Sequence, residues 1–120
     1  MISSLISAAL LAASVQSAPA SSATPDLSQS SKALLRCSAA FAMVSHGQSN
    51  GNEAALKWPK LETRGREFFV RSLAQLMDET GLDRPGISRL VSAEAQLLWD
   101  RGEIDKVMPS CLVMLDGSGV

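Results

Sequence analysis

Residues 32–44, KALLRCSAAFAMV, are the segment from which the architecture of this chain can be worked out most directly. Apolar side chains recur here at intervals of three, four and seven residues, the spacing that places them on one face of an α-helix. The stripe starts just before the segment and contains a cysteine, since it consists of Leu27, Leu34, Cys37, Phe41 and Val44. We therefore expect an amphipathic helix whose cysteine faces the core.

The ends of this helix are also marked in the sequence. Thr24 is expected to be its N-cap, because Pro25 follows and proline is well tolerated at the first helical position. The helix is expected to run to about His46, with Gly47 as its C-terminal stop. After a polar loop, Trp58 precedes a proline and is therefore disfavoured in a helix. We expect it to anchor the connection on the core.

Two further helices are expected in the middle of the chain. The first spans about residues 60–80, and Gly81 ends it. Gly65 inside this helix is expected to permit a close approach to the alanine-rich face of the first helix. The second helix begins after the N-cap Asp83 and ends near Arg101. Because the turn between them is short, the two helices are expected to pack antiparallel.

The last apolar stretch, residues 104–115, again has helical spacing. Pro109 interrupts it, so a kink or two short helices are expected, followed by a frayed tail. The period-two alternation of strands is missing. The predicted fold is therefore a small all-α bundle of about four helices.

The chain has two cysteines, Cys37 and Cys111, one near each end of this bundle. In an exported protein they are expected to form one disulfide between the first and last helices. Two buried free thiols are the alternative. A metal site is not expected, because there is no CxxC and only one histidine.

Export is predicted by residues 1–20, which carry no charged side chain and hold an apolar run over residues 5–13. Ala18-Pro19-Ala20 then supplies a small-x-small cleavage site, as in a secretory signal peptide. Cleavage between Ala20 and Ala23 would leave a flexible lead-in (21–31), a helical domain (32–116) and a tail (117–120). We expect a periplasmic or secreted protein with no stable membrane insertion after cleavage.

Charge and motifs exclude several function classes. The net charge of −1 gives no electrostatic footprint for nucleic acid. His46 is the only histidine, which removes most Ser-His-Asp and Cys-His schemes, and no phosphate-binding or hydrolase motif is present. We therefore expect no enzyme, no catalytic residue, no cofactor and no bound metal.

Three residues are candidates for a functional feature. In helical projection Glu94 falls within the apolar face of its helix, and Arg66 falls within the apolar arc of the preceding one. We expect them to form a buried salt bridge, as a register lock or as the polar end of a ligand pocket. The alternative is that this helical phase is wrong and that Glu94 is exposed to solvent. Trp99 projects away from this stripe, so it either packs on the first or last helix or anchors a partner at the surface.

Four short stretches carry a resemblance: residues 36–41, 64–70, 76–79 and 109–112. They resemble a group of small exported helical proteins of proteobacteria that have no assigned activity. The resemblance covers about residues 32–115 and implies an exported helical domain. A more distant analogy, to HdeA-type acid-stress chaperones and helical immunity proteins, implies a protein that binds other proteins.

The expected function is accordingly that of an exported, non-enzymatic, protein-binding domain, such as an inhibitor, an immunity-type protein or a chaperone. The alternative is a carrier for a small apolar ligand, with Arg66 and Glu94 at its polar end. A large apolar pocket would favour the carrier, and an exposed apolar patch containing Trp99 would favour the binder. The sequence leaves the oligomeric state open.

Overall fold

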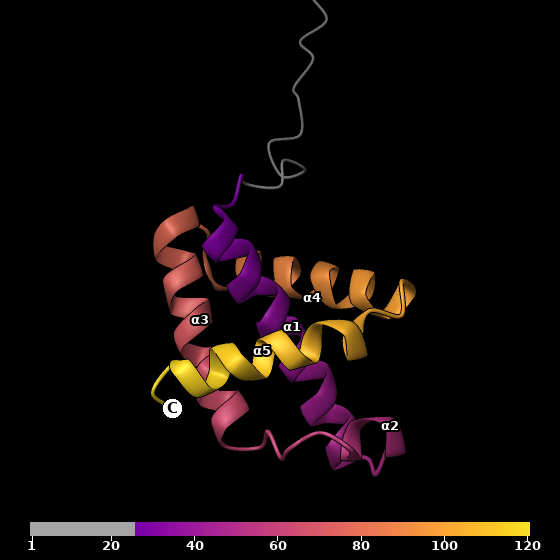
Figure 1. The fold of residues 1–120 in the computed structure, drawn as a ribbon. Helices are drawn as coiled ribbons and strands as arrows, with labels where there is room; N and C mark the ends of the chain where they lie inside the picture. Colours follow the sequence, from indigo (N-terminus) through magenta and orange to yellow (C-terminus); the bar gives the residue numbers. More distant parts are fainter. Residues whose placement is uncertain (1–25) are drawn as a thin grey trace, which may run out of the picture.

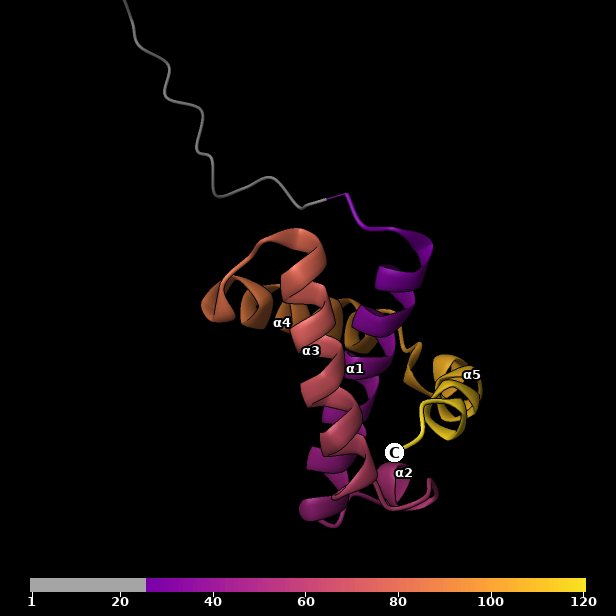
Figure 2. The same ribbon diagram turned by 90° about the vertical axis from the view of Figure 1, so that its left-hand side faces the viewer.

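The computed structural model describes residues 26–120, and within them the chain forms five α-helices and no strand. The helices are α1 (Gln29–Ser49), α2 (Glu53–Leu56), α3 (Arg64–Thr80), α4 (Arg84–Asp100) and α5 (Ile104–Gly117). α1 lies at the centre, and the other helices pack around it (Figures 1 and 2). The predicted all-α bundle is confirmed, with the single turn of α2 added to the four expected helices. The predicted signal peptide lies outside the described residues.

The core forms where the other helices meet α1. Cys37 and Cys111 are both buried and joined by a disulfide, with their Cα atoms 5.2 Å apart. The disulfide between the first and last helices is therefore confirmed, and the alternative of two free thiols is wrong. The largest fully buried apolar side chains of the core are Phe41, Leu61, Leu76, Ile87, Met108 and Leu115.

α1 begins later than expected, so the predicted N-cap at Thr24 is wrong. Ser28 caps the helix instead, because its hydroxyl accepts a hydrogen bond from the backbone N–H of Ser31. The side chain of Ser31 is buried and donates a hydrogen bond to Glu79 of α3. These contacts bring residues 29–31 into the helix, although they were expected to belong to the flexible lead-in.

α1 also ends later than expected, because Gly47 is not its stop. The helix continues to Ser49, and the positive φ of 71° that reverses the chain belongs to Gly51. Gly47 instead permits a close approach of α2. A Cβ atom at Gly47 would lie 2.7 Å from the Cβ of Ala55.

α3 starts at Arg64 rather than at residue 60, because the preceding connection is held in an irregular path over the core. Gly65 is buried, but the atoms that crowd it belong to this connection. A Cβ at Gly65 would lie 2.9 Å from the Cβ of Leu61. The expected close approach to the alanine-rich face of α1 is therefore not the reason for this glycine.

The turn between α3 and α4 has the predicted chemistry but a different geometry. Gly81 adopts a φ of 70° after the last residue of α3, and the Asp83 carboxylate caps α4 at Gly86 N–H, 2.9 Å away. However, α4 runs across α1 at a steep angle to α3 (Figures 1 and 2). The expected antiparallel packing of these two helices is wrong, since the apolar side of α4 packs mainly on α1.

α5 is one continuous helix in spite of Pro109. The proline side chain is exposed, and the carbonyl that loses its partner belongs to the exposed Asp105, where water can satisfy it. The tail after α5 does not fray as expected. The backbone carbonyl of Val120 accepts a hydrogen bond from Arg64 Nε at 3.2 Å, and the Val120 side chain packs against the core.

Candidate functional site

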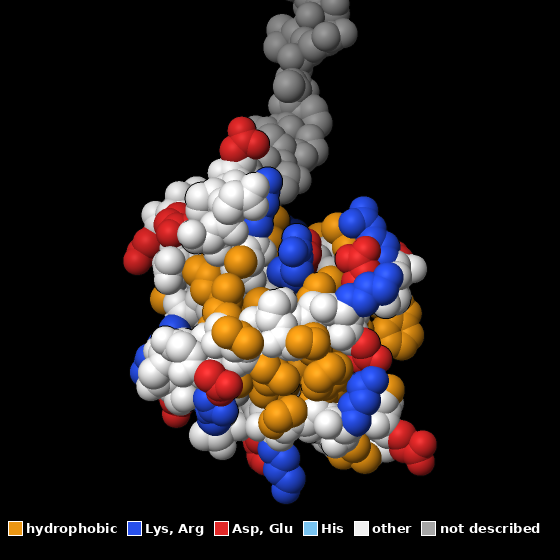
Figure 3. Space-filling model, viewed as in Figure 1, with side chains coloured by type: hydrophobic (Ala, Val, Ile, Leu, Met, Phe, Trp, Pro, Cys, Tyr) orange, Lys and Arg blue, Asp and Glu red, His pale blue; other side chains and the backbone are white. Residues whose placement is uncertain are grey.

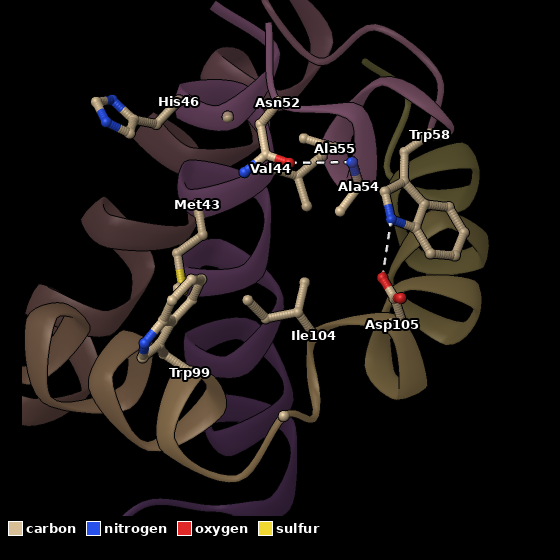
Figure 4. Close-up of a pocket in the computed structure, with 12 residues that line it drawn as sticks. Met43, Val44, His46, Asn52, Ala54, Ala55, Trp58, Trp99, Ile104 and Asp105 are labelled. Atoms are coloured by element: carbon tan, nitrogen blue, oxygen red, sulfur yellow. Dashed lines mark hydrogen bonds between the residues drawn. The ribbon is translucent and has the colours of Figure 1, made fainter. Parts of the chain in front are cut away.

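An apolar groove of about 550 Å³ lies where α2, the end of α4 and the start of α5 meet the C-terminal half of α1. Trp99 and Met43 stand on one side of it and Trp58 and Asp105 on the other, with Ile104 between them (Figure 4). Most of the remaining lining is apolar or small, including Val44, Ala54 and Ala55. A hollow of this size can receive a small ligand or one or two large side chains of a protein partner.

The side chain of Gln48 builds the part of the groove that carries Trp58. Its amide nitrogen lies 2.9–3.2 Å from the backbone carbonyl oxygens of Ala55, Trp58 and Pro59, which share its two N–H donors. Its amide oxygen accepts one from the N–H of Leu61 at 3.1 Å. A single side chain of α1 therefore satisfies the backbone of a connection that has no regular structure of its own.

Trp58 is half-buried and anchors the connection on the core, as expected. Its indole N–H donates a hydrogen bond to Asp105 Oδ1 at 3.3 Å, and Lys57 Nζ lies 2.6 Å from Asp105 Oδ2. The Lys57 ammonium is also 5.3 Å from the centre of the Trp58 ring. The hydrogen bond from Lys57 holds the pKa of Asp105 below its usual value of 3.8, because it favours the ionised carboxylate.

Trp99 lies in the last turn of α4 and is 66% exposed. Of the two expectations for this residue, packing on the first or last helix would have buried it. The observed exposure agrees with the other expectation, a side chain at the surface. One side of the indole faces the groove beside Met43, and the rest of the ring faces solvent.

The predicted Arg66–Glu94 salt bridge is not present. Glu94 is paired with Arg36 of α1, with Oε1 and Nε 3.8 Å apart, and its side chain is 21% exposed. Glu94 was expected within the apolar face of α4, and it is partly buried on the side of this helix that meets α1. Two expectations were wrong: α4 packs on α1 instead of lying alongside α3, and Arg66 lies on the exposed side of α3 rather than within its apolar arc.

Arg66 is exposed on α3 and lines a separate, smaller hollow of about 290 Å³. Phe41, Glu62 and Phe69 line the same hollow. Arg66 and Glu94 are thus not brought together, and neither lines the groove beside Trp99.

A second apolar feature is the outer side of α5. Residues 107–115 of this helix include no charged side chain. One of them, Val113, is nevertheless 72% exposed, so part of this uncharged surface faces solvent. Figure 3 shows hydrophobic side chains gathered over α5 and the neighbouring surface, with charged side chains around them. An exposed apolar helix face is typical of a surface that a partner covers.

Met43, Gln48 and Asp105 contribute to the groove but were not recognised in the sequence. Met43 is an apolar residue directly before Val44 of the apolar stripe, and this position could have identified it in the sequence. Gln48 and Asp105 carry no such local signal, since their partners are 7–13 and 47–48 residues away. His46 lies in the last turn of α1, as expected, and its ring is 3.2 Å from the Asn50 side chain.

Within residues 26–120, His, Cys, Asp and Glu side chains form no group of three that could hold a metal ion. No helix in this part of the chain is long and apolar enough to cross a membrane. The protein matches no protein-family model, no curated protein and no solved structure.

Proposed function

We propose that this chain is an exported, periplasmic or secreted protein that binds another protein and catalyses no reaction. The observation that carries the proposal is the exposed indole of Trp99 at the edge of an apolar groove. Tryptophan is enriched among the residues that dominate protein interfaces, because one side chain can bury a large area on a rigid ring. Met43 beside it supplies an adaptable apolar surface.

Export is supported by two independent features. The first twenty residues have the layout of a signal peptide. The Cys37–Cys111 disulfide fits an oxidising compartment, because such bonds rarely persist in the cytosol.

A carrier for a small apolar ligand is the second candidate, and the volume and apolar lining of the groove favour it. Carrier sites commonly bury most of the surface of their ligand. The strong exposure of Trp99 on one wall leaves this groove open, which is why protein binding is preferred.

The proposal is tested by a photoreactive amino acid placed at position 99 of the chain while it is expressed in the exporting cell. Illumination at neutral and at acid pH, followed by mass spectrometry, should capture one protein in a defined ratio. The same amino acid at Val70, which is 61% exposed on α3 away from the groove, is the matched control and should not capture it. The mass of the recovered chain also tests cleavage between Ala20 and Ala23.

The possible results separate the kinds of binder. One partner at both pH values fits an inhibitor or an immunity-type protein, whereas many partners found only in acid fit a chaperone. If position 99 captures no protein at either pH, the protein-binding proposal is wrong, and a co-purified apolar molecule would then support the carrier.

A further inference from the structure

The first residues of α5 supply the middle of the groove and part of one side. Ile104 lies between the two sides, and Asp105 lies on the side of Trp58 (Figure 4). The Asp105 carboxylate accepts hydrogen bonds from the Trp58 indole at 3.3 Å and from the Lys57 ammonium at 2.6 Å. The groove therefore has its observed shape only while α5 is docked on α1.

Local and exposed contacts hold α5 weakly. Among the described residues, no side chain caps the N-terminus of this helix, and Pro109 removes one hydrogen bond from its interior. Its ion pairs, Lys57–Asp105 and Arg64–Asp116, have side chains that are 46–70% exposed, and exposed pairs contribute little. A helix of 14 residues is marginal without packing. The position of α5 therefore depends on its buried side and on its covalent links.

α5 has two covalent links to the other helices. One is the backbone turn after α4, and the other is the disulfide from Cys111 to Cys37 of α1. α3 and α4 pack mainly on α1 and have little contact with α5, so α5 can leave α1 without separating them. The packing of α1 on α3 includes an edge-to-face pair of Phe41 and Phe68, with ring centres 5.2 Å apart. The disulfide is the link that a change of redox state can remove.

The disulfide also lies on the helix faces from which the groove is built. Cys111 follows Ile104 by seven residues, and Val44 follows Cys37 by seven, which is about two helical turns in each case. Ile104 and Val44 both line the groove. The bond therefore holds α5 on the stripe of α1 that continues into the groove.

Burial of the two sulfur atoms couples their chemistry to the movement of α5. Cys37 and Cys111 are 4% and 1% exposed. Thiol–disulfide exchange requires a thiolate to attack one of the sulfur atoms directly. A reductant therefore reaches the bond only when α5 moves away from α1.

We propose that the disulfide is a redox switch for the groove. In the oxidised chain α5 stays docked and the groove is formed, whereas in the reduced chain α5 detaches from α1 and the groove is lost. The bond forms by exchange with an oxidant that carries a disulfide: the two cysteine thiols lose two electrons and two protons, and the oxidant becomes two thiols. This inference rests on the proposed function in that it takes the groove as the binding surface. It adds that the chain acquires this surface only in an oxidising compartment.

The first test is amide hydrogen exchange, measured by mass spectrometry on the oxidised protein and on the same protein kept reduced by a dithiol. In the reduced protein, α5 is expected to exchange at close to the rate of an unstructured chain, and α3 and α4 roughly 100-fold or more slowly. In the oxidised protein α5 is expected to be protected. Cys37→Ala/Cys111→Ala should behave as the reduced protein does, which separates the loss of the bond from any effect of the dithiol.

The second test observes the groove directly. In Trp99→Phe the only tryptophan is Trp58, and its emission should shift to longer wavelength on reduction, because it loses Asp105 and becomes more exposed. Asp116→Asn is the matched control, since it removes an ion pair of α5 but keeps the disulfide. In the oxidised form it should change the exchange of α5 by less than about 5-fold, the limit for an exposed pair.

An α5 that remains protected in the reduced protein overturns the inference, and so does a Trp58 emission that reduction leaves unchanged. Equal exchange of α3 and α5 in the reduced protein overturns it as well, because the bond would then stabilise the whole domain rather than the groove. These readouts need no partner. A failure of the proposed function, in which position 99 captures no protein in the exporting cell, is therefore a different result.

Discussion

At the residue scale, Gln48 and Asp105 hold the wall of the groove that carries Trp58. Gln48 bonds the backbone of the connection between α2 and α3, and Asp105 bonds the Lys57 and Trp58 side chains from α5. Both act on groups far from them in the sequence. Their contributions can be separated, because one is a network of neutral hydrogen bonds and the other depends on ionisation.

Replacing Gln48 by alanine should lower the free energy of unfolding by about 1–3 kcal/mol, the cost of leaving buried backbone groups without partners. The backbone N–H of Leu61, a residue that is only 1% exposed, loses its acceptor in this variant. Urea denaturation measures the change. Gln96→Ala is the control and should stay within about 0.5 kcal/mol of the wild type, because Gln96 bonds only Asp100 on an exposed face. Equal losses in the two variants would contradict the role assigned to Gln48.

The Asp105 contacts should depend on pH. Lys57 lowers the pKa of Asp105 in the folded protein, so the carboxylate stabilises the fold above its usual pKa of 3.8. That contribution is lost as the pH falls through the lower, folded value. The stability difference between the wild type and Asp105→Asn should therefore be present at about pH 6 and shrink towards zero at about pH 2. The pair is exposed, so the difference should stay below about 1 kcal/mol.

Urea unfolding at each pH, followed by tryptophan fluorescence, measures this difference. Asp78→Asn, at an exposed position of α3, is the matched control. A difference for Asp105→Asn that is the same at pH 6 and pH 2 would rule out the ionised pair as its cause.

At the element scale, the ends of the helices follow local rules, and their packing does not. Gly81 and Asp83 mark the turn between α3 and α4 as the sequence indicated. The direction of α4 after that turn is set by the fit of its apolar side on α1. Gly47 is a second example of packing that local rules do not predict. It does not end α1, and it permits the close approach of α2.

Two glycine substitutions test how closely α2 packs on α1. Gly47→Ala places a Cβ 2.7 Å from that of Ala55, so α2 must move, and a loss of about 1–3 kcal/mol is expected despite the better helix propensity of alanine. Gly117→Ala, in the last turn of α5, adds a methyl group with no atom within 4 Å. It should leave the stability unchanged or raise it by less than about 1 kcal/mol. Thermal unfolding of both variants provides the comparison, and a Gly47→Ala protein as stable as Gly117→Ala would argue against the close contact.

At the scale of the whole molecule, the disulfide joins the central helix to the last one. α5 packs on α1 and, to a smaller extent, on α3. The bond closes a loop of 74 residues, which contains α2, α3 and α4. It therefore restricts the unfolded chain across most of the described domain.

Removing this bond should lower the free energy of unfolding by about 4 kcal/mol in the chain-entropy model of a loop of 74 residues. Cys37→Ala/Cys111→Ala and the reduced wild type should show similar losses in urea denaturation. Amide hydrogen exchange should increase first in α5, whose packing is the least extensive of the four long helices. Equal stability of the oxidised and reduced proteins would contradict this account.

The sequence by itself determined the helical class of the protein, the cap at Asp83, the turn at Gly81 and the one pairing open to its two cysteines. Each of these depends on a few neighbouring residues, or on there being only one possible pair of cysteines. The tertiary structure decided that Glu94 meets Arg36 instead of Arg66, that Gly47 faces α2, and that Trp99 borders a groove. The physical reason is that the crossing angles of helices result from side-chain packing between segments far apart in the chain. Apolar periodicity within one helix identifies the buried face but does not identify the helix that covers it.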